Sequence, residues 1–500
     1  MDYFKKFIDL NPDKTLKEFR TKGDSYWKRT GERMALRLFK QASQRVPAYK
    51  DFLKKNKVNP NNIKNISDFK KVPIIDKENY INKYKLSELC WDGKIEDSYF
   101  LSASSGSTGI PNFWPRSTEQ TFQGASISEL IYKEYFECDK KTTLYIVAFA
   151  MGMWIAGTYM TMSTEWVAQK GYPITVVTPG LNREEIFRLI KMGLQYYDQI
   201  VLVGYPPFVK DVVDYATDQG IEWKDNRIRF LFSGEAFTER WRTYLAEKVN
   251  LRNPLTDTIN IYGSADVGLV AHETPLTNFI RGLAANNKGI MRSLFAAERV
   301  PSVNQYDPHI RYFEKVGEEL IVTSPSGLPL VRYNTKDIGD ILYFREVEKS
   351  LEKYDISLTR EFKKRRMSSL LWKTPIVYLF GRGKFSASIY GVTIFPEYIK
   401  FVLDNKKLAN SLTGKYVIST EEDKSHNQSL HLHVELKENK ESSRELAGLI
   451  KEVFVNELPK ISSEYRHLLG SMGVKVHPEI HLHSYGDPDY FPRGIIKKTA

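Results

Sequence analysis

Residues 199–249, QIVLVGYPPFVKDVVDYATDQGIEWKDNRIRFLFSGEAFTERWRTYLAEKV, alternate between two kinds of hydrophobic pattern. The short apolar runs 199–206 and 228–234 are each followed by an amphipathic stretch with helical spacing. Toward the N-terminus, LYIVAFA (144–150) and PITVVTP (173–179) precede another amphipathic stretch, 184–197. Strands that alternate with helices over about 95–345 predict an α/β fold with mostly parallel sheets covered by helices. The loops that follow the strands are where such a sheet binds ligands.

The two ends of the chain show different patterns. Residues from about 15 to 46 have apolar residues at helical spacing and predict a helix that ends near the Val46-Pro47 step. Beyond about residue 384, strand candidates and one clear helix (441–458) predict a small α+β domain. The strand candidates are YGVTIF (390–395), YVIST (416–420), SLHLHVEL (429–436) and VKVHPEIHLHS (474–484). We therefore predict a large domain over 1–381, with a helical start over 1–95, and a small domain over 382–500.

Composition places the chain among globular proteins. Its 500 residues are 42% hydrophobic and 13% aromatic, which excludes one small module and a disordered chain. A net charge of +12 is typical of proteins that bind nucleic acid, an anionic membrane or a phosphate-bearing substrate. A basic solvated surface without a partner is the alternative. The chain has only two cysteines, Cys90 and Cys138, which are too few for a disulfide framework or for a metal site made of thiolates alone. We expect a reducing, cytoplasmic compartment.

Two segments bear on targeting. The N-terminus has Lys and Asp where a signal peptide needs an apolar run. Residues 142–164 carry no charge and are long enough to span a bilayer, but they contain two Gly and many Ser and Thr. We expect a turn between a buried strand and a helix there, and no membrane partner.

The segment LSASSGSTGIPNFWPRS (101–117) carries the most chemical information. Small hydroxyl residues alternate with Gly106 and Gly109, so the backbone can approach a polyphosphate and donate N–H and O–H groups to its oxygens. No Lys follows Gly109, so the segment is not the common phosphate loop. A flexible surface loop is the alternative.

The same segment resembles the phosphate loop of the adenylate-forming enzymes, which include the acyl-CoA synthetases and read Ser-Ser-Gly-Ser/Thr-Thr-Gly-x-Pro there. Further segments resemble motifs of that family and occur in the family's order. They are FSGEAFTERW (232–241), INIYGSADVG (259–268), LVRYNTKDIGD (330–340) and LFGRGKFSASIYGVTIFPEYI (379–399). In the C-terminal YFPRGIIKKTA, Lys497 stands close to the spacing of the family's catalytic lysine. Ile496 replaces the usual preceding Gly, and Lys498 is the fallback assignment.

The resemblance implies a role for each segment. Asp337 would accept hydrogen bonds from the ribose hydroxyls, and Asp266 stands where the family usually has the Mg²⁺-associated Glu. Lys384 would lie at the hinge of a mobile small domain, and Lys497 would contact the carboxylate and phosphate oxygens. The ATP- or AMP-binding residues would be Ser104, Ser105, Gly106, Ser107, Thr108, Gly109, Gly234, Glu235, Ala236, Tyr262, Gly263, Ser264, Asp337 and Arg382.

Within that superfamily, residues 45–80 most resemble the phenylacetate-CoA ligase branch, with Val-Pro-x-Tyr and Val-Pro-x-x-x-Lys as landmarks. The resemblance implies ATP- and Mg²⁺-dependent activation of a small carboxylic acid as an acyl adenylate, followed by transfer to CoA. An apolar acyl pocket would draw on 148–157 and 203–209, although core packing explains the same residues. Its side chains would be Met151, Met153, Trp154, Tyr205 and Phe208.

Several alternatives stay open. The acyl group could pass to a carrier-protein or enzyme thiol instead of CoA. A non-catalytic or nucleic-acid-binding protein on the same scaffold is motivated by Asp266, Ile496, the net charge and KKRR at 363–366. A homodimer is also open.

Two pairs of alternating histidines, His431 with His433 and His481 with His483, would each lie on one face of a strand. Imidazoles placed in this way could ligate a metal ion. No third ligand stands at a readable spacing, so the sequence favours ordinary strand residues.

Overall fold

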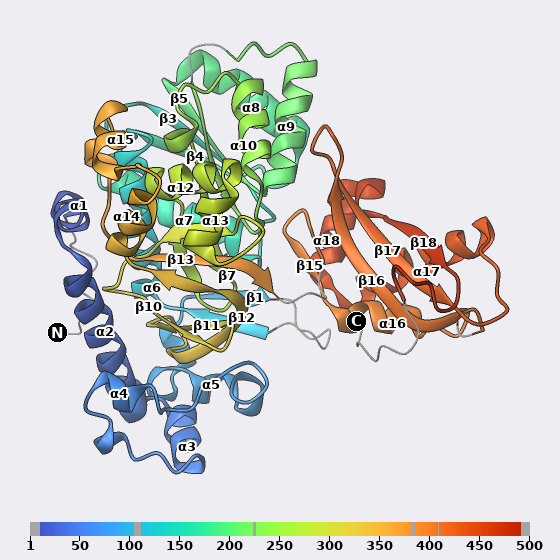
Figure 1. Cartoon of the computed structure of the whole chain (residues 1–500), viewed down its shortest axis with the longest axis horizontal. Coiled ribbons are helices and arrows are strands. Elements are labelled where there is room, and N and C mark those ends of the chain that lie inside the picture. Colours follow the sequence, from blue (N-terminus) through green and yellow to red (C-terminus); the bar gives the residue numbers. More distant parts are fainter. Residues whose placement is uncertain (1–10, 105–111, 224–226, 383–386, 409, 492–500) are drawn as a thin grey trace. The chain divides into compact units, whose positions relative to one another are not determined.

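A computed structural model describes residues 11–104, 112–223, 227–382, 387–408 and 410–491 (Figure 1). The chain divides into two compact units. The large unit comprises Met1–Ser102, Phe113–Gly204 and Val212–Arg382, and the small unit comprises Ala103–Asn112, Tyr205–Asp211 and Gly383–Ala500. The predicted domain boundary between residues 381 and 382 stays a prediction.

The large unit is built on one mixed sheet of 11 strands in the order β10-β11-β12-β13-β9-β8-β7-β6-β5-β3-β4. Neighbouring strands run parallel from β4 to β7 and antiparallel from β7 to β10. The strands are β3 (Thr143–Ala148), β4 (Ile174–Val177), β5 (Gln199–Gly204), β6 (Ile228–Ser233), β7 (Thr258–Ser264), β8 (Gly268–His272), β9 (Ser302–Gln305), β10 (Tyr312–Val316), β11 (Glu319–Ser324), β12 (Leu330–Leu342) and β13 (Ile376–Arg382).

The α/β class is confirmed, but the predicted parallel pairing holds for only one part of the sheet. Parallel neighbours need a long crossover, which the helices between β3 and β7 provide. Among the later strands, β7 to β8, β10 to β11 and β11 to β12 are neighbours joined by short connections, such as the two residues between β10 and β11, where Gly317 has a φ of +63°. Short connections make neighbouring strands antiparallel. A further pair, β1 (Phe100–Ser104) and β2 (Asn112–Arg116), forms a separate two-stranded sheet.

Helices cover the parallel part of the sheet (Figure 1). Helix α8 shows how the sequence specifies one of them. Its N-cap Asn182 accepts a hydrogen bond from the Glu185 N–H, and Ile186 and Ile190 are buried one helical turn apart. Gly193 continues that face, where an added Cβ would lie only 2.8 Å from Leu144. The α-helices between β2 and β13 are α6 (Thr118–Glu134), α7 (Ile155–Gln169), α8 (Arg183–Tyr196), α9 (Pro206–Asp218), α10 (Glu239–Lys248), α11 (Pro254–Asp257), α12 (Pro275–Asn286), α13 (Lys288–Phe295), α14 (Phe344–Glu352) and α15 (Leu358–Lys364).

The helix predicted over 15–46 is in fact two helices. The backbone is extended at Lys22 and Gly23, so one helix ends and a second begins there. The second ends at Arg45 as predicted, because Pro47 restricts Val46 to an extended conformation. The helices before β1 are α1 (Pro12–Thr21), α2 (Asp24–Arg45), α3 (Pro47–Lys55), α4 (Ile66–Phe69) and α5 (Leu86–Leu89).

Helices α12 to α15 share one hydrophobic cluster with β9 and β13, which includes Ile280, Val303 and Ile376. The basic tract KKRR lies at the end of α15. Its Arg365 pairs with Glu361 and lies 4.8 Å from the centre of the Phe279 ring. Arg365 therefore takes part in packing.

The small unit contains an α+β arrangement after residue 387. In its three-stranded sheet, β16 pairs antiparallel with β17, and β17 pairs parallel with β18. The strand predicted over 474–484 begins only at Pro478, because Gly473–Val476 form a 3₁₀-helix. The elements are β14 (Ala387–Ile389), β15 (Val392–Ile394), α16 (Pro396–Leu403), β16 (Leu412–Glu422), β17 (Gln428–Leu436), α17 (Arg444–Ile461), α18 (Ser463–Met472) and β18 (Pro478–His483).

The uncharged stretch 142–164 forms β3, a turn and the first part of α7, as expected. No helix in the described part of the chain combines the length and the apolar character needed to span a membrane.

Candidate active site

The predicted nucleotide-binding residues Tyr262 and Asp337 meet in the structure. The Tyr262 hydroxyl on β7 donates a hydrogen bond to Asp337 Oδ2 on β12 at 2.6 Å. These strands stand four positions apart in the sheet, so the sheet must bend back on itself to bring them together. Arg382 on β13 is the register partner of Asp337. Asp337 is 5% exposed, and a buried carboxylate is stable only when donors or cations satisfy it.

Asp266 lies in the turn between β7 and β8 and is 4% exposed. Its Oδ2 accepts a hydrogen bond from the Tyr333 hydroxyl, and its Oδ1 lies 3.2 Å from Lys77 Nζ. The turn is fixed from β2, where buried Arg116 donates to the Ala265 carbonyl. Lys77 therefore neutralises a carboxylate that would otherwise be a buried charge.

Lys77 reaches this carboxylate because the segment before it pairs with β12. The Ile75 N–H donates to the Arg332 carbonyl at 3.0 Å, and the Asn334 N–H donates to the Ile75 carbonyl at 2.8 Å. Arg332 has a φ of +52° at a bulge in the pairing of β12 with β11. Its guanidinium donates to two carbonyls of the same segment, those of Lys70 and Val72.

The Mg²⁺ role predicted for Asp266 stays a prediction. Magnesium uses carboxylate oxygens in a near-octahedral shell and keeps several waters. Both oxygens of Asp266 are already held, one by Tyr333 and one by Lys77, and the carboxylate is almost fully buried. Lys77 already supplies a positive charge to this carboxylate.

The predicted adenine loop, Gly234 to Ala236, connects β6 to α10. Gly234 has a φ of +90°, a conformation that favours glycine. Asn260 Nδ2 on β7 donates to the Glu235 carbonyl at 3.0 Å, and Arg281 on α12 donates to the Phe237 carbonyl. Side chains from two other elements thus hold the backbone of this loop.

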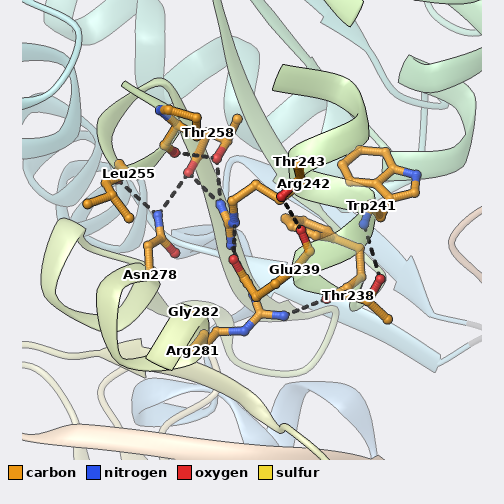
Figure 2. A network of polar contacts seen from close by, with 12 residues as sticks. Thr238, Glu239, Trp241, Arg242, Thr243, Leu255, Thr258, Asn278, Arg281 and Gly282 are labelled. Carbon is orange, nitrogen blue, oxygen red and sulfur yellow. Dashed lines mark hydrogen bonds and ion pairs between the residues drawn. The ribbon is translucent and has the colours of Figure 1, made fainter. Parts of the chain in front are cut away.

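A buried ionic network joins side chains of α10 and α12 (Figure 2). Arg242 Nη2 lies 2.8 Å from Glu273 Oε1, and Arg242 Nε lies 3.0 Å from Glu239 Oε2. Arg281 Nη1 pairs with both of these carboxylates. Burial opposes the charged form of Glu239, but Arg242 and Arg281 outweigh it and hold the pKa of this carboxyl below its usual value. Two acids and two guanidinium groups leave the network neutral in sum.

His272, beside Glu273, makes stability depend on pH. Burial lowers the pKa of His272 to about 4, and its Nδ1–H donates to the Glu273 carbonyl at 2.7 Å. Between pH 6.5 and pH 4 the unfolded chain binds a proton that the folded chain does not, so stability falls as the pH falls.

We expect the free energy of unfolding to decrease by about 2 kcal/mol between about pH 7 and about pH 5 from this group. Urea unfolding at both pH values should show a smaller decrease for His272→Gln. The exposed His467→Gln is the control, and an equal decrease in wild type and His272→Gln would contradict the assignment.

Solved structures share this architecture. The chain is similar to 2-hydroxyisobutyryl-CoA ligase in complex with 2-HIB-AMP and CoA in the thioesterification state. The TM-score is 0.65 at 13% sequence identity, over 94% of this chain and 88% of that chain. It is also similar to the same ligase in the postadenylation state with R3-HIB-AMP, with a TM-score of 0.56 at 12% identity, over 96% of this chain and 89% of that chain. The chain has the same fold as this ligase.

No protein-family model and no curated protein sequence matches the chain. The fold that the motifs predicted is confirmed by this structural similarity. The phenylacetate-CoA ligase branch stays a prediction.

Other predicted site residues have defined places in the fold. Gly263 and Ser264 end β7, and Ser264 Oγ accepts a hydrogen bond from the Val267 N–H at 3.1 Å. The acyl-pocket candidates Met151 and Trp154 are half-buried before α7, and Met153 is 48% exposed. Tyr205 follows β5, and Phe208 is buried in α9. The acyl pocket stays a prediction.

Several predicted residues lie outside the described residues. They are Ser105, Gly106, Ser107, Thr108, Gly109, Lys384, Ile496, Lys497 and Lys498. Ser104 ends β1 and Arg382 ends β13, and both are placed by their backbone alone.

The motifs predicted no role for Lys77, Tyr333 or the Arg242–Glu273 pair. Lys77 is the last residue of the Val-Pro-x-x-x-Lys landmark, and Tyr333 is the Tyr of the segment that contains Asp337. Both stood in recognised motifs whose chemistry was unassigned. Arg242 and Glu273 are 31 residues apart and share no local motif, so no sequence signal pointed to them.

Proposed function

We propose that the protein activates a carboxylic acid with ATP as an acyl adenylate and transfers the acyl group to a thiol, with CoA as the acceptor. The meeting of Tyr262 and Asp337 carries the proposal. Two motifs 75 residues apart, each assigned to the nucleotide, converge on one hydrogen bond. The adenylate-forming fold supports it, and the similar ligase is bound to 2-HIB-AMP and CoA.

A free carboxylic acid is a poor acyl donor, because hydroxide or oxide is a poor leaving group. Conversion to an acyl adenylate makes AMP the leaving group. In the first step a carboxylate oxygen attacks the α-phosphorus of ATP, so an O–P bond forms and the bond to pyrophosphate breaks. In the second step a thiolate attacks the acyl carbon, and the C–O bond to AMP breaks. Such transfers depend on positioning and on cationic stabilisation of phosphate charge.

The proposal assigns a task to each segment. Backbone N–H groups of 104–109 bind the phosphates, and the loop at Gly234–Ala236 lies against adenine. Asp337 accepts hydrogen bonds from the ribose hydroxyls, with Arg382 near the nucleotide. Lys497 contacts the carboxylate and phosphate oxygens, and Lys384 serves the hinge.

Neutralisation of Asp266 by Lys77 supports the same proposal. A bare carboxylate in the turn after β7 would repel the phosphates of a bound nucleotide. The ion pair with Lys77 at 3.2 Å offsets that charge.

ATP–pyrophosphate exchange with pooled carboxylic acids tests the first step. We expect exchange that requires an acid, followed by thioester formation when CoA is added. Exchange without a CoA product would favour the carrier-protein or enzyme thiol as the acceptor. A protein that binds ATP but shows no exchange with any pool would contradict adenylation.

Asp337→Asn should raise the KM for ATP in this exchange by roughly 10- to 100-fold, because a hydrogen bond to a charged group contributes about 1.5–3 kcal/mol. Asp340→Asn is the matched control on the same strand. Asp340 is partly exposed and pairs with Lys315 at 3.0 Å, so its loss should change the KM little. Equal changes in both variants would contradict the ribose role of Asp337.

A further inference from the structure

Four histidines of the small unit lie on one face of its sheet. The strands β17 and β18 pair in parallel, with His431 opposite Glu479 and His433 opposite His481. Residues two apart along a strand share a face, so His483 and Glu479 project from the same side as His481. Strand pairing thus places a carboxylate beside the histidines as a third ligand.

Three of these side chains bring ligand atoms together. His431 Nδ1 lies 2.8 Å from His481 Nε2 and 3.8 Å from Glu479 Oε2. All three ligand atoms lie within 4.8 Å of one another. Two imidazole nitrogens that bind one tetrahedral Zn²⁺ stand roughly 3.3 Å apart, given Zn–N bonds of about 2.0–2.1 Å. The two rings therefore need to separate by only about half an ångström to admit the ion.

Neighbouring groups already orient the rings. Ser429 Oγ lies 2.7 Å from His431 Nε2, which leaves Nδ1 directed at His481. Metal-ligating histidines commonly have such a hydrogen bond at the second ring nitrogen. The His481 ring also stacks on the His433 ring at a centroid distance of 4.4 Å.

The cluster opens to solvent at its acidic edge. The Glu479 side chain is 60% exposed, whereas that of His431 is 11% exposed. Within the described ranges, His431 is the sole ion-pair partner of Glu479. The carboxylate is therefore accessible to an incoming cation, and water can reach a fourth coordination position.

We infer that His431, His481 and Glu479 form a binding site for a divalent transition-metal ion, with Zn²⁺ the best match to two imidazoles and one carboxylate. The ligands are His431 Nδ1, His481 Nε2 and a Glu479 oxygen, with water in the fourth position. The ion joins β17 to β18 through histidines 50 residues apart. This site lies within the small unit and is independent of the proposed adenylation.

Competition of the full-length protein against a chromophoric zinc indicator tests the site. We expect one Zn²⁺ per chain in the wild type. His481→Ala and Glu479→Gln should each weaken binding by at least about tenfold, since even outer-shell changes cost 10- to 100-fold. Co²⁺ titration should give the intense visible absorption of tetrahedral coordination, and His481→Ala should lose it.

Two further variants and a folding check keep the test specific. His467→Ala, on the exposed surface of α18, should leave the affinity unchanged. His433→Ala should weaken binding less than His481→Ala. Thermal melting in EDTA identifies variants that remain folded. Absence of stoichiometric Zn²⁺ uptake, or a larger loss in His433→Ala than in His481→Ala, would overturn the proposal.

Discussion

Glu273→Gln is expected to lower the free energy of unfolding by about 3–5 kcal/mol, because it leaves buried guanidinium charge uncompensated. Glu273 pairs with both Arg242 and Arg281, and each of these three side chains is at most 3% exposed. After the substitution, two buried arginines share the single charge of Glu239. The cost of a buried unpaired charge far exceeds that of losing one hydrogen bond.

Urea unfolding of the full chain measures this effect, with Glu298→Gln as the matched control. Glu298 pairs with Arg292 at 2.8 Å, but their side chains are 71% and 60% exposed. Exposed ion pairs contribute about 0–1 kcal/mol, so the control should change stability little. Similar decreases in the free energy of unfolding in the two variants would contradict the expected cost of leaving a buried charge unpaired.

The same substitution has a functional consequence under the proposed function. Arg281 holds the Phe237 carbonyl next to the predicted adenine loop, and Glu273 holds Arg281. Glu273→Gln should therefore also raise the KM for ATP. Asp337→Asn, in contrast, should raise this KM without a comparable loss of stability.

Lys497→Ala is expected to lower the rate of ATP–pyrophosphate exchange by roughly 100- to 1,000-fold. One preorganised donor that stabilises charge in the transition state contributes on this scale. Lys498→Ala is the matched control, since it removes the same charge one residue away and should leave the rate near that of the wild type. A larger loss in Lys498→Ala would move the catalytic role to that residue. Equal melting temperatures would separate this effect from unfolding.

The parallel part of the fold could be predicted from the sequence. Buried strands such as β3 and β5 are continuous apolar runs, and the helices between them have an amphipathic period. The antiparallel part was not predicted, because the sequences of short strands such as β9 and β10 do not indicate which strands they pair with. The division of the N-terminal helix at Lys22 and Gly23 was also missed, since helical spacing continues across it.

Motifs predicted some residues of the candidate site, but not the contacts that these residues make. Motifs identified Tyr262 and Asp337, and the structure brings them together. The motif that contains Asp266 suggested a metal ligand, whereas the carboxylate is held by Tyr333 and Lys77. Lys77 reaches it through backbone pairing of Ile75 with β12, a contact between distant segments that no local pattern records.

The sequence by itself determined the order of strands and helices, the nucleotide motifs and the face on which each histidine pair lies, because periodicity and local sterics act over a few residues. Only the tertiary structure decided which strands became neighbours. It brought Lys77 to Asp266, Arg281 to Glu273 and Glu479 beside His431. These partners are chosen by burial and by the pairing of distant strands, since a buried charge must find its counter-charge wherever the chain folds back to supply one.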